Sequence, residues 1–306
     1  MTEDRPRVAV IVLTFNKRED LLACLESLND LDYAPYETLV VDNGSEDGSA
    51  EAVAAAFPDV HLLQNGTNLG ASLGRNRGAA YVQKHLSADH LLFLDDDTVV
   101  DPAFLDHLSR ALTADPKAAI AFGKGYTAFP SNTIMSAGMI ANFSIGRVYD
   151  RGAGETDHGQ YDEPMEMAAC GGFGFLMRAE VFRALDGMDA IFTPYGWEDV
   201  DLCLRAGRAG HSCIYVPEAV IYHKGGKIGR GPVMAYERHK AKNFIILLLR
   251  HTSPGQKWSC LISVALRELM NLAKLLLRGQ FHIVGSHFRG LFEFLSQRGS
   301  SSKGPP

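Results

Sequence analysis

The stretch His90-Leu91-Leu92-Phe93-Leu94-Asp95-Asp96-Asp97 (residues 90–97) joins an apolar run to three adjacent aspartates. An apolar run without alternation predicts a strand buried on both faces, as in a parallel sheet between layers of helices. Three neighbouring carboxylates repel one another, so beside a buried strand they need either open solvent or a positive partner. A solvated acidic turn meets this condition, and so does a divalent cation held by oxygen ligands.

The same alternation of apolar runs and helical periodicity extends outward along the chain. Buried strands are expected at 8–13, 38–41, 60–63 and 91–94, and helices at 21–28, 50–57, 77–85 and 102–112. This order predicts βαβ units with right-handed crossovers, and therefore an α/β fold with a mostly parallel sheet flanked by helices. Residues 120–177 lose the helical periodicity, which predicts short mixed or antiparallel strands. Further helices are expected at 178–185 and 198–209, and closing strands at 212–216 and 219–222.

The composition argues against several classes of protein. A net charge of -6 gives no general electrostatic reason to bind nucleic acid. The five cysteines lack the spacing of a metal site or a disulfide framework, which predicts buried thiols in a reducing compartment. No apolar stretch reaches the roughly 18 residues of a membrane span. Acidic residues near the start are unlike a secretory signal, so we expect a cytoplasmic protein.

Polar residues follow the carboxyl end of each expected strand. Thr14 and Asn16 follow the first, Asp42 the second, a Gly- and Asn-rich loop at 65–74 the third, and the three aspartates the fourth. Each alone has an ordinary explanation as a cap or turn residue. In a parallel sheet, however, these ends share one edge, where ligands bind. No glycine-rich phosphate loop is present, so the expected pocket suits a nucleoside diphosphate neutralised by a carboxylate-held metal.

A second acidic cluster, Glu198-Asp199-Val200-Asp201, follows Trp197 and begins an expected helix. Acidic residues there complement the helix dipole, and Asp201 is spaced to pair with Arg205, which is a purely structural interpretation. The alternative for Glu198 and Asp199 is a general base for an acceptor hydroxyl, with the Trp197 ring excluding water. His223 follows the last expected strand. Its side chain either packs against neighbouring residues or lies at the surface, or it completes the ligands of a metal ion.

These blocks resemble the inverting glycosyltransferases of family 2, which have the GT-A fold. The resemblance covers about three-quarters of the chain, in the family's order: VAVIVLTFN (8–16), VVDNGSEDGS (40–49), NLGASLGRNRG (68–78), FLDDDT (93–98), GGFGFLMRAEVF (171–182), GWEDVDLCLR (196–205) and VIYH (220–223). The acidic helix block is similar to that of bacterial transferases that build surface polysaccharides, rhamnosyltransferases among them.

The resemblance implies a role for each matched position. Asp199 would be the catalytic base, and Glu198 would orient it or the acceptor. Asp97 and His223 would hold Mn²⁺ or Mg²⁺. The donor nucleotide would contact Thr14, Asn16, Asp42, Arg75, Asp95 and Asp96, and the acceptor side would include Gly171, Gly172 and Trp197.

The same resemblance implies a metal-dependent inverting transfer from a UDP- or dTDP-sugar, with dTDP-rhamnose as one candidate. The acceptor would be a hydroxyl of a glycan or a lipid-linked saccharide in polysaccharide or cell-envelope synthesis. A different class, a scaffold that binds sugar nucleotides without catalysis, is the alternative. A nucleotidyltransferase would carry a basic glycine-rich loop after its first strand, and residues 14–17 do not form one.

We expect a catalytic domain at 1–230, with a nucleotide-binding half at about 1–115 and an acceptor-side half at about 116–230. A C-terminal helical segment is expected at 231–298, with helices at 236–250, 257–277 and 281–297, followed by a disordered tail at 299–306. The helices pair apolar stripes with Lys and Arg. They would either rest on anionic lipid at the inner face of the membrane, or pack against the catalytic domain or a second subunit as a homodimer.

Overall fold

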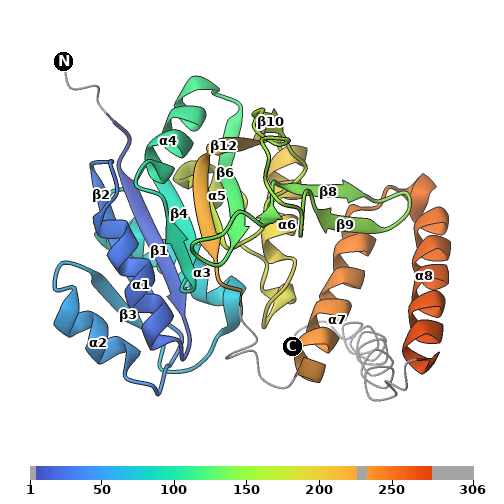
Figure 1. Cartoon of the computed structure of the whole chain (residues 1–306), viewed down its shortest axis with the longest axis horizontal. Helices are drawn as coiled ribbons and strands as arrows, with labels where there is room; N and C mark the ends of the chain where they lie inside the picture. Colours follow the sequence, from blue (N-terminus) through green and yellow to red (C-terminus); the bar gives the residue numbers. More distant parts are fainter. Residues whose placement is uncertain (1–4, 226–232, 278–306) are drawn as a thin grey trace, which may run out of the picture. The chain divides into compact units, whose positions relative to one another are not determined.

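The computed structural model describes residues 5–225 and 233–277, and a large mixed sheet is its framework (Figure 1). The strand order is β10-β12-β6-β11-β4-β1-β2-β3, with β5 paired to β12 and β7 to β6. The strands are β1 (Val8–Thr14), β2 (Tyr36–Asp42), β3 (His61–Gln64), β4 (His90–Asp95), β5 (Thr98–Val100), β6 (Ala118–Thr127), β7 (Ile134–Ser136), β8 (Met139–Asn142), β9 (Arg147–Asp150), β10 (Met165–Glu166), β11 (Gly174–Arg178) and β12 (Ser212–His223).

The parallel half of the sheet is centred on β1, which lies between β2 and β4 and runs parallel to both. The register pairs Thr14 with Asp42 and Leu13 with Asp95. Three of the predicted polar residues therefore leave the sheet at one edge. The predicted parallel α/β arrangement is confirmed.

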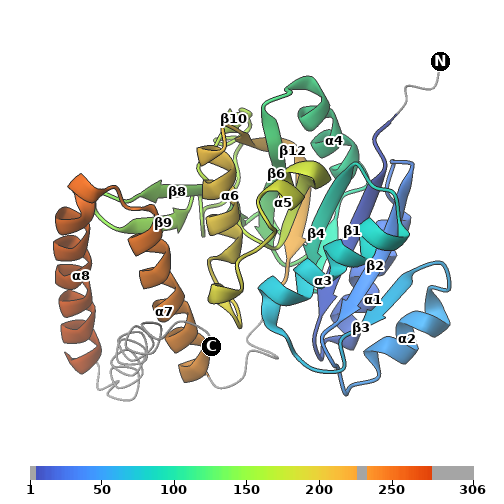
Figure 2. The same cartoon turned by 180° about the vertical axis from the view of Figure 1, so that it is seen from behind.

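Helices cover both faces of this sheet: α1 (Arg18–Asn29), α2 (Ser49–Ala56), α3 (Gly70–His85), α4 (Phe104–Ala114), α5 (Ala179–Ala184) and α6 (Glu198–Arg208). Leucines of α1 and α4 share one apolar cluster with Val10 of β1. On the other face α3 approaches closely, because a Cβ at Gly78 would lie 2.8 Å from Ile11 and 2.9 Å from Val41. Figure 2 shows α3, α5 and α6 on this second face.

The middle of the chain adds the expected antiparallel strands. β11 lies between β4 and β6 and is antiparallel to both, while β8 and β9 form a separate pair. One strand, β12, replaces the two expected closing strands. Its pairing with β6 is irregular between Val216 and Val220, where Pro217 has no N–H to donate.

The helix α3 begins at Gly70, inside the segment expected to be a loop up to Gly74. Gly70 adopts a positive φ of 79°, and its N–H donates to Asn68 Oδ1 at 2.9 Å. This local turn starts the helix early. Arg75 therefore lies in the second turn of α3, and it is buried, so the alternative of a surface arginine on a helix is wrong.

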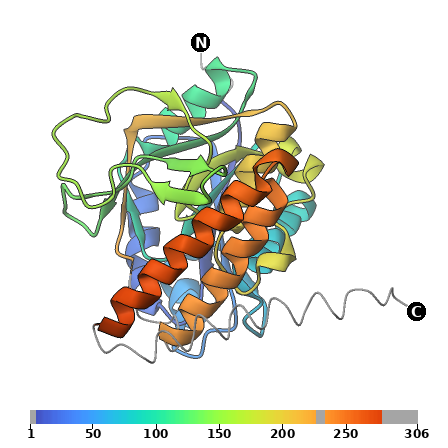
Figure 3. The same ribbon diagram turned by 90° about the vertical axis from the view of Figure 1, so that its right-hand side faces the viewer.

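The chain divides into two compact units, of which the second contains 141–148, 194–197 and 230–306. Within it, α7 (Val233–His251) and α8 (Lys257–Leu277) lie side by side (Figure 3). Asn243 Nδ2 donates to Tyr195 O at 2.8 Å, and Arg267 Nη2 donates to Gly146 O at 2.7 Å. No helix within the described ranges is long and apolar enough to span a membrane. The helix expected at 281–297 and the tail at 299–306 lie outside the described residues.

Candidate active site

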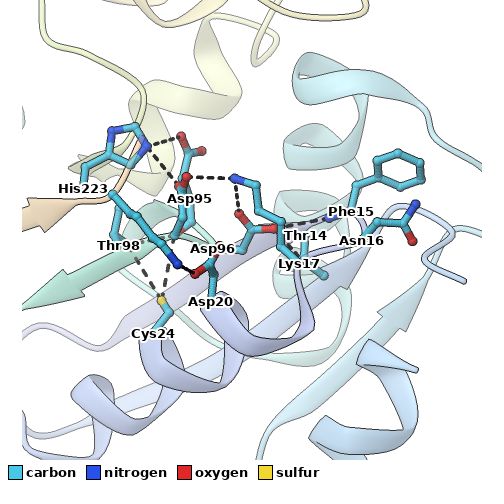
Figure 4. A network of polar contacts seen from close by, with 12 residues as sticks. Thr14, Phe15, Asn16, Lys17, Asp20, Cys24, Asp95, Asp96, Thr98 and His223 are labelled. Carbon is cyan, nitrogen blue, oxygen red and sulfur yellow. Dashed lines mark hydrogen bonds and ion pairs between the residues drawn. The ribbon is translucent and has the colours of Figure 1, made fainter. Parts of the chain in front are cut away.

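The acidic triplet lies at the end of β4, beside the end of β1 (Figure 4). Asp96 is buried, and its Oδ2 accepts hydrogen bonds from Thr14 Oγ1 at 2.9 Å and from the Phe15 N–H at 3.3 Å. These bonds fix Asp96 against the first strand. Asp95 and Asp97 make further contacts, to Arg75 and to His223.

Lys17, which precedes α1, is the positive partner of the acidic triplet, and the sequence did not indicate this pairing. Its Nζ lies 3.2 Å from Asp96 Oδ1 and 2.8 Å from Asp97 Oδ2. Burial opposes its charge, but Asp96 and Asp97 hold the pKa of Lys17 well above its usual range. Burial, aided by Asp97 and opposed by Lys17, raises the pKa of Asp96 to about 7. In the sequence, Lys17 is marked only as a basic residue shortly after the first strand.

Asp95, Asp97 and His223 bring their ligand atoms within 4.8 Å of one another. His223 Nε2 lies 2.9 Å from Asp97 Oδ1 and 3.8 Å from Asp95 Oδ2. Burial acts against ionisation of Asp97, but the hydrogen bond and charge of His223, together with Lys17, hold its pKa well below the usual range. Two carboxylates and one imidazole at this spacing fit Mn²⁺ or Mg²⁺. This is the predicted metal pair with Asp95 added.

His223 is held in place by the aromatic ring of Phe173. The two rings stack with centroids 5.2 Å apart and an interplanar angle of 13°. A Cβ at Gly171 would lie 2.8 Å from the Phe173 ring, and one at Gly125 would lie 2.6 Å from it. These two glycines therefore leave the space that the ring occupies.

Arg75 joins the two acidic clusters. Its side chain is 3% exposed, and Nη2 lies 2.5 Å from Asp95 Oδ1 and 2.9 Å from Gly172 O. Its Nη1 lies 3.5 Å from Glu198 Oε1. Burial opposes the charge of Arg75, but the neighbouring carboxylates raise its pKa. The side chain therefore holds the triplet and the start of α6 in one site.

Glu198 and Asp199 form the first turn of α6, after Trp197 in a left-handed conformation (φ 75°). Burial and then the charge of Glu198 raise the pKa of Asp199 to about 8. A Cβ at Gly172 would lie 2.9 Å from Asp199 Oδ2, so the glycine permits this close approach. A carboxylate with such a pKa is suited to accept a proton near neutral pH.

The structural interpretation of Asp201 is confirmed by an ion pair with Arg205. Asp201 Oδ2 lies 2.7 Å from Arg205 Nε, and the Asp201 side chain is completely buried. It lies on the same helix as Asp199 but has its own cation. This pair leaves Glu198 and Asp199 as the two acidic residues of that turn near Arg75.

Asn16 and Asp42 shape the neighbouring loop. Asn16 Oδ1 accepts from the Glu46 N–H at 2.8 Å, and Asp42 Oδ1 accepts from the Ser45 N–H at 2.9 Å. Their contact with a nucleotide stays a prediction.

Trp197 belongs to the second unit, where its Nε1 donates to Lys240 O at 3.0 Å. Its acceptor-side role also stays a prediction.

Comparisons with known proteins identify the family of the chain. The sequence profile described as "Glycosyl transferase family 2" matches residues 9–185. The chain is 31% identical over 291 residues to the N-acetylglucosaminyl-diphospho-decaprenol L-rhamnosyltransferase of Mycobacterium tuberculosis. This match covers 88% of this chain and 92% of that protein. It is also 25% identical over 257 residues to galactofuranosyltransferase GlfT2 of Mycolicibacterium smegmatis, covering 72% of this chain and 37% of that one.

Solved structures match the fold. The mannosyltransferase PcManGT of Pyrobaculum calidifontis, in complex with GDP-Man and Mn²⁺, has a TM-score of 0.59 and 17% identity over 96% of this chain and 88% of that chain. GalNAc-T7 with UDP, GalNAc and Mn²⁺ has a TM-score of 0.62 and 17% identity, covering 79% of this chain and 47% of that chain. The architecture is therefore the GT-A fold that the sequence predicted.

Proposed function

Because the chain belongs to glycosyltransferase family 2, we propose that it is a metal-dependent inverting L-rhamnosyltransferase. The donor is a nucleoside-diphosphate L-rhamnose, and dTDP-rhamnose is the first candidate to test. The acceptor is a hydroxyl of a saccharide linked to a polyprenyl diphosphate. The donor and acceptor classes rest on the similarity to the mycobacterial N-acetylglucosaminyl-diphospho-decaprenol L-rhamnosyltransferase.

One observation carries the catalytic assignment: Arg75 contacts Asp95 on one side and Glu198 on the other. The proposed diphosphate site at Asp95 and the proposed base beside Glu198 would then lie on either side of Arg75. A bound divalent cation would stabilise the negative charge of the departing diphosphate, a contribution of several kcal/mol. Asp95, Asp97 and His223 are the residues that would hold it.

Asp199 takes the proton of the acceptor hydroxyl as that oxygen attacks the anomeric carbon. The bond from the anomeric carbon to the acceptor oxygen forms, and the bond to the diphosphate oxygen breaks. Attack from the face opposite the diphosphate inverts the anomeric centre. Gly172 carries no side chain, which leaves room for the Asp199 carboxylate beside it. Arg75 holds Asp95 and Glu198, the neighbour of Asp199, in fixed positions.

The function is tested with a panel of UDP-, GDP- and dTDP-sugars in the presence of Mn²⁺ or Mg²⁺, scored for binding, donor hydrolysis and transfer to a short polyprenyl-diphosphate saccharide. We expect dTDP-rhamnose to be used and the product to be inverted, as read by NMR of the new linkage. Transfer of a different sugar would refute the donor assignment. Retention of the anomeric configuration would refute the single displacement.

Asp97→Ala tests the metal assignment, with Asp59→Ala as the matched control because Asp59 is an exposed aspartate. We expect Mn²⁺ to strengthen donor binding in the wild type and the control and to have no effect in Asp97→Ala. Mn²⁺-dependent binding in Asp97→Ala would remove this residue from the metal shell.

We propose further that α8 rests on an anionic lipid surface, where a lipid-linked acceptor is found. It exposes a series of large apolar side chains: Trp258, Leu261, Ile262, Leu266, Leu269 and Met270. Residues 231–306 hold 11 Lys and Arg but 3 Asp and Glu, whereas residues 1–230 hold 19 against 33. An apolar face on a basic segment of an acidic protein favours anionic lipid.

Vesicle sedimentation tests this surface. The wild type should sediment with phosphatidylglycerol vesicles and less with phosphatidylcholine, and Trp258→Ala should weaken sedimentation. Ile191→Ala is the control, since Ile191 is an exposed apolar residue outside α8. Equal sedimentation of Trp258→Ala and wild type would contradict the proposal, as would dimerisation through this face in gel filtration.

A further inference from the structure

Three of the five cysteines lie together in the core, which their spacing in the sequence did not predict. Cys170 precedes Gly171, Cys203 lies in α6, and Cys213 lies near the start of β12. Their sulfur atoms are within 4.8 Å of one another, and Cys170 Sγ and Cys203 Sγ are 3.6 Å apart. None of the three residues is more than 5% exposed.

The spacing of the sulfurs suits a shared cation. A tetrahedral ion bound by thiolates at 2.3 Å places the sulfurs about 3.8 Å apart, close to the distance between Cys170 and Cys203. Thiolates select soft cations such as Zn²⁺ and Cu⁺, whereas Mn²⁺ and Mg²⁺ prefer oxygen ligands. The cluster therefore differs in chemistry from the site at Asp97 and His223.

Only the thiolate form of cysteine binds a metal ion, so coordination would release thiol protons to the buffer. Binding should therefore strengthen as pH rises.

We propose that Cys170, Cys203 and Cys213 form a binding site for one thiophilic cation of the zinc and cadmium class. The site lies next to the catalytic machinery. Cys203 follows Asp199 by four residues and so lies one turn along the same face of α6. Cys170 precedes by two residues Gly172, whose carbonyl accepts from Arg75.

A cation held there ties three separate elements together. It joins the segment that carries Gly171 and Gly172 to α6 and to the start of β12. The acceptor side of the site is thereby fixed to the helix that carries Asp199. The role of the ion is structural, because the three cysteines are buried and are not among the residues proposed to bind the donor or to accept the proton.

The test titrates Cd²⁺ into fully reduced protein in excess Mn²⁺ and follows the ultraviolet sulfur-to-cadmium charge-transfer band. The band should saturate at one equivalent. Cys203→Ser should lose it, while Asp97→Ala, which alters the other metal site, should keep it. Cys260→Ser is the matched control, since Cys260 is also buried but lies outside the cluster.

X-ray absorption of the cadmium-loaded wild type provides a second measurement that needs no variant to fold. We expect three sulfur neighbours around the ion. A shell of oxygen and nitrogen, the absence of a band, or a band that Cys203→Ser retains would each overturn the proposal. Measured on the resting protein, these outcomes are independent of whether rhamnose is transferred.

Discussion

Replacing Asp199 by Asn is expected to make the protein more stable at neutral pH while abolishing transfer. In the folded protein burial and Glu198 raise the pKa of Asp199 to about 8, from a usual value of 3.8. A carboxyl whose pKa is raised on folding stabilises the fold fully below its unfolded pKa. That contribution is lost as pH rises towards the folded pKa. Asparagine is neutral at every pH and escapes this loss.

The size of the effect follows from the pKa difference. Each unit corresponds to 1.36 kcal/mol, so at pH 7 the ionisable Asp199 disfavours folding by at most about 4 kcal/mol relative to a neutral residue. Solvent reaches part of the Asp199 side chain, which makes this figure an upper bound. The stability gap between Asp199→Asn and wild type should be near zero at pH 4 and widen up to about pH 8.

Urea unfolding of both proteins between pH 5 and pH 8.5 measures the gap, and Asp59→Asn is the exposed control, for which no gap is expected. The same samples should show that Asp199→Asn keeps donor affinity and loses transfer by about 10²- to 10⁴-fold. A gap that does not change with pH, or a variant less stable than wild type at pH 8, would refute the reasoning. Asp199 would then be ionised throughout, paired with Arg75.

Three further outcomes follow from the same site. Lys17→Met should lower the free energy of unfolding in metal-free buffer by up to about 3–5 kcal/mol, because Asp96 loses its cation while Asp97 keeps His223 as a partner. Added Mn²⁺ should restore part of this loss, as measured by thermal unfolding with and without Mn²⁺. Gly172→Ala should reduce kcat about 10²-fold with donor affinity unchanged, because the added Cβ displaces the Asp199 carboxylate. Gly207→Ala is the control and should leave the kinetic constants unchanged, because the space around Gly207 is open. Log kcat/KM should rise with pH and level off above about 8, as Asp199 ionises; a flat profile from pH 6 to 9 would assign the base elsewhere.

The fold was predictable wherever apolar runs were unambiguous. The strand at 8–13 and the strand at 91–94 are β1 and β4, because no other structure buries such runs on both faces. The single strand β12 was not predictable, since Pro217 interrupts its pairing but not its direction. The start of α3 was misjudged because the Gly- and Asn-rich segment that precedes Arg75 is also typical of a loop.

The site was predictable as a set of residues but not as a network of contacts. The family resemblance named Asp97, His223 and Asp199; the structure brings Asp97 and His223 together, and the roles of all three stay predictions. The sequence did not indicate that Lys17 would be the partner of Asp97, because a lysine after a strand has many ordinary roles. Nor did it show that Arg75 would contact Glu198, more than 120 residues away in the chain. Such pairings depend on tertiary packing, which no local pattern encodes.

The antiparallel strand β11 limits how far a change in the preceding segment can spread. Because Gly174 pairs with Leu94, the chain returns to the sheet beside the end of β4. Between Thr127 and Gly174 the chain adds β7 and β10 to the main sheet, and these pair with β6 and β12. A change of length in the loops between these strands would therefore leave the pairing of β4 with β1 and β11 intact, and with it the positions of Thr14 and Asp95.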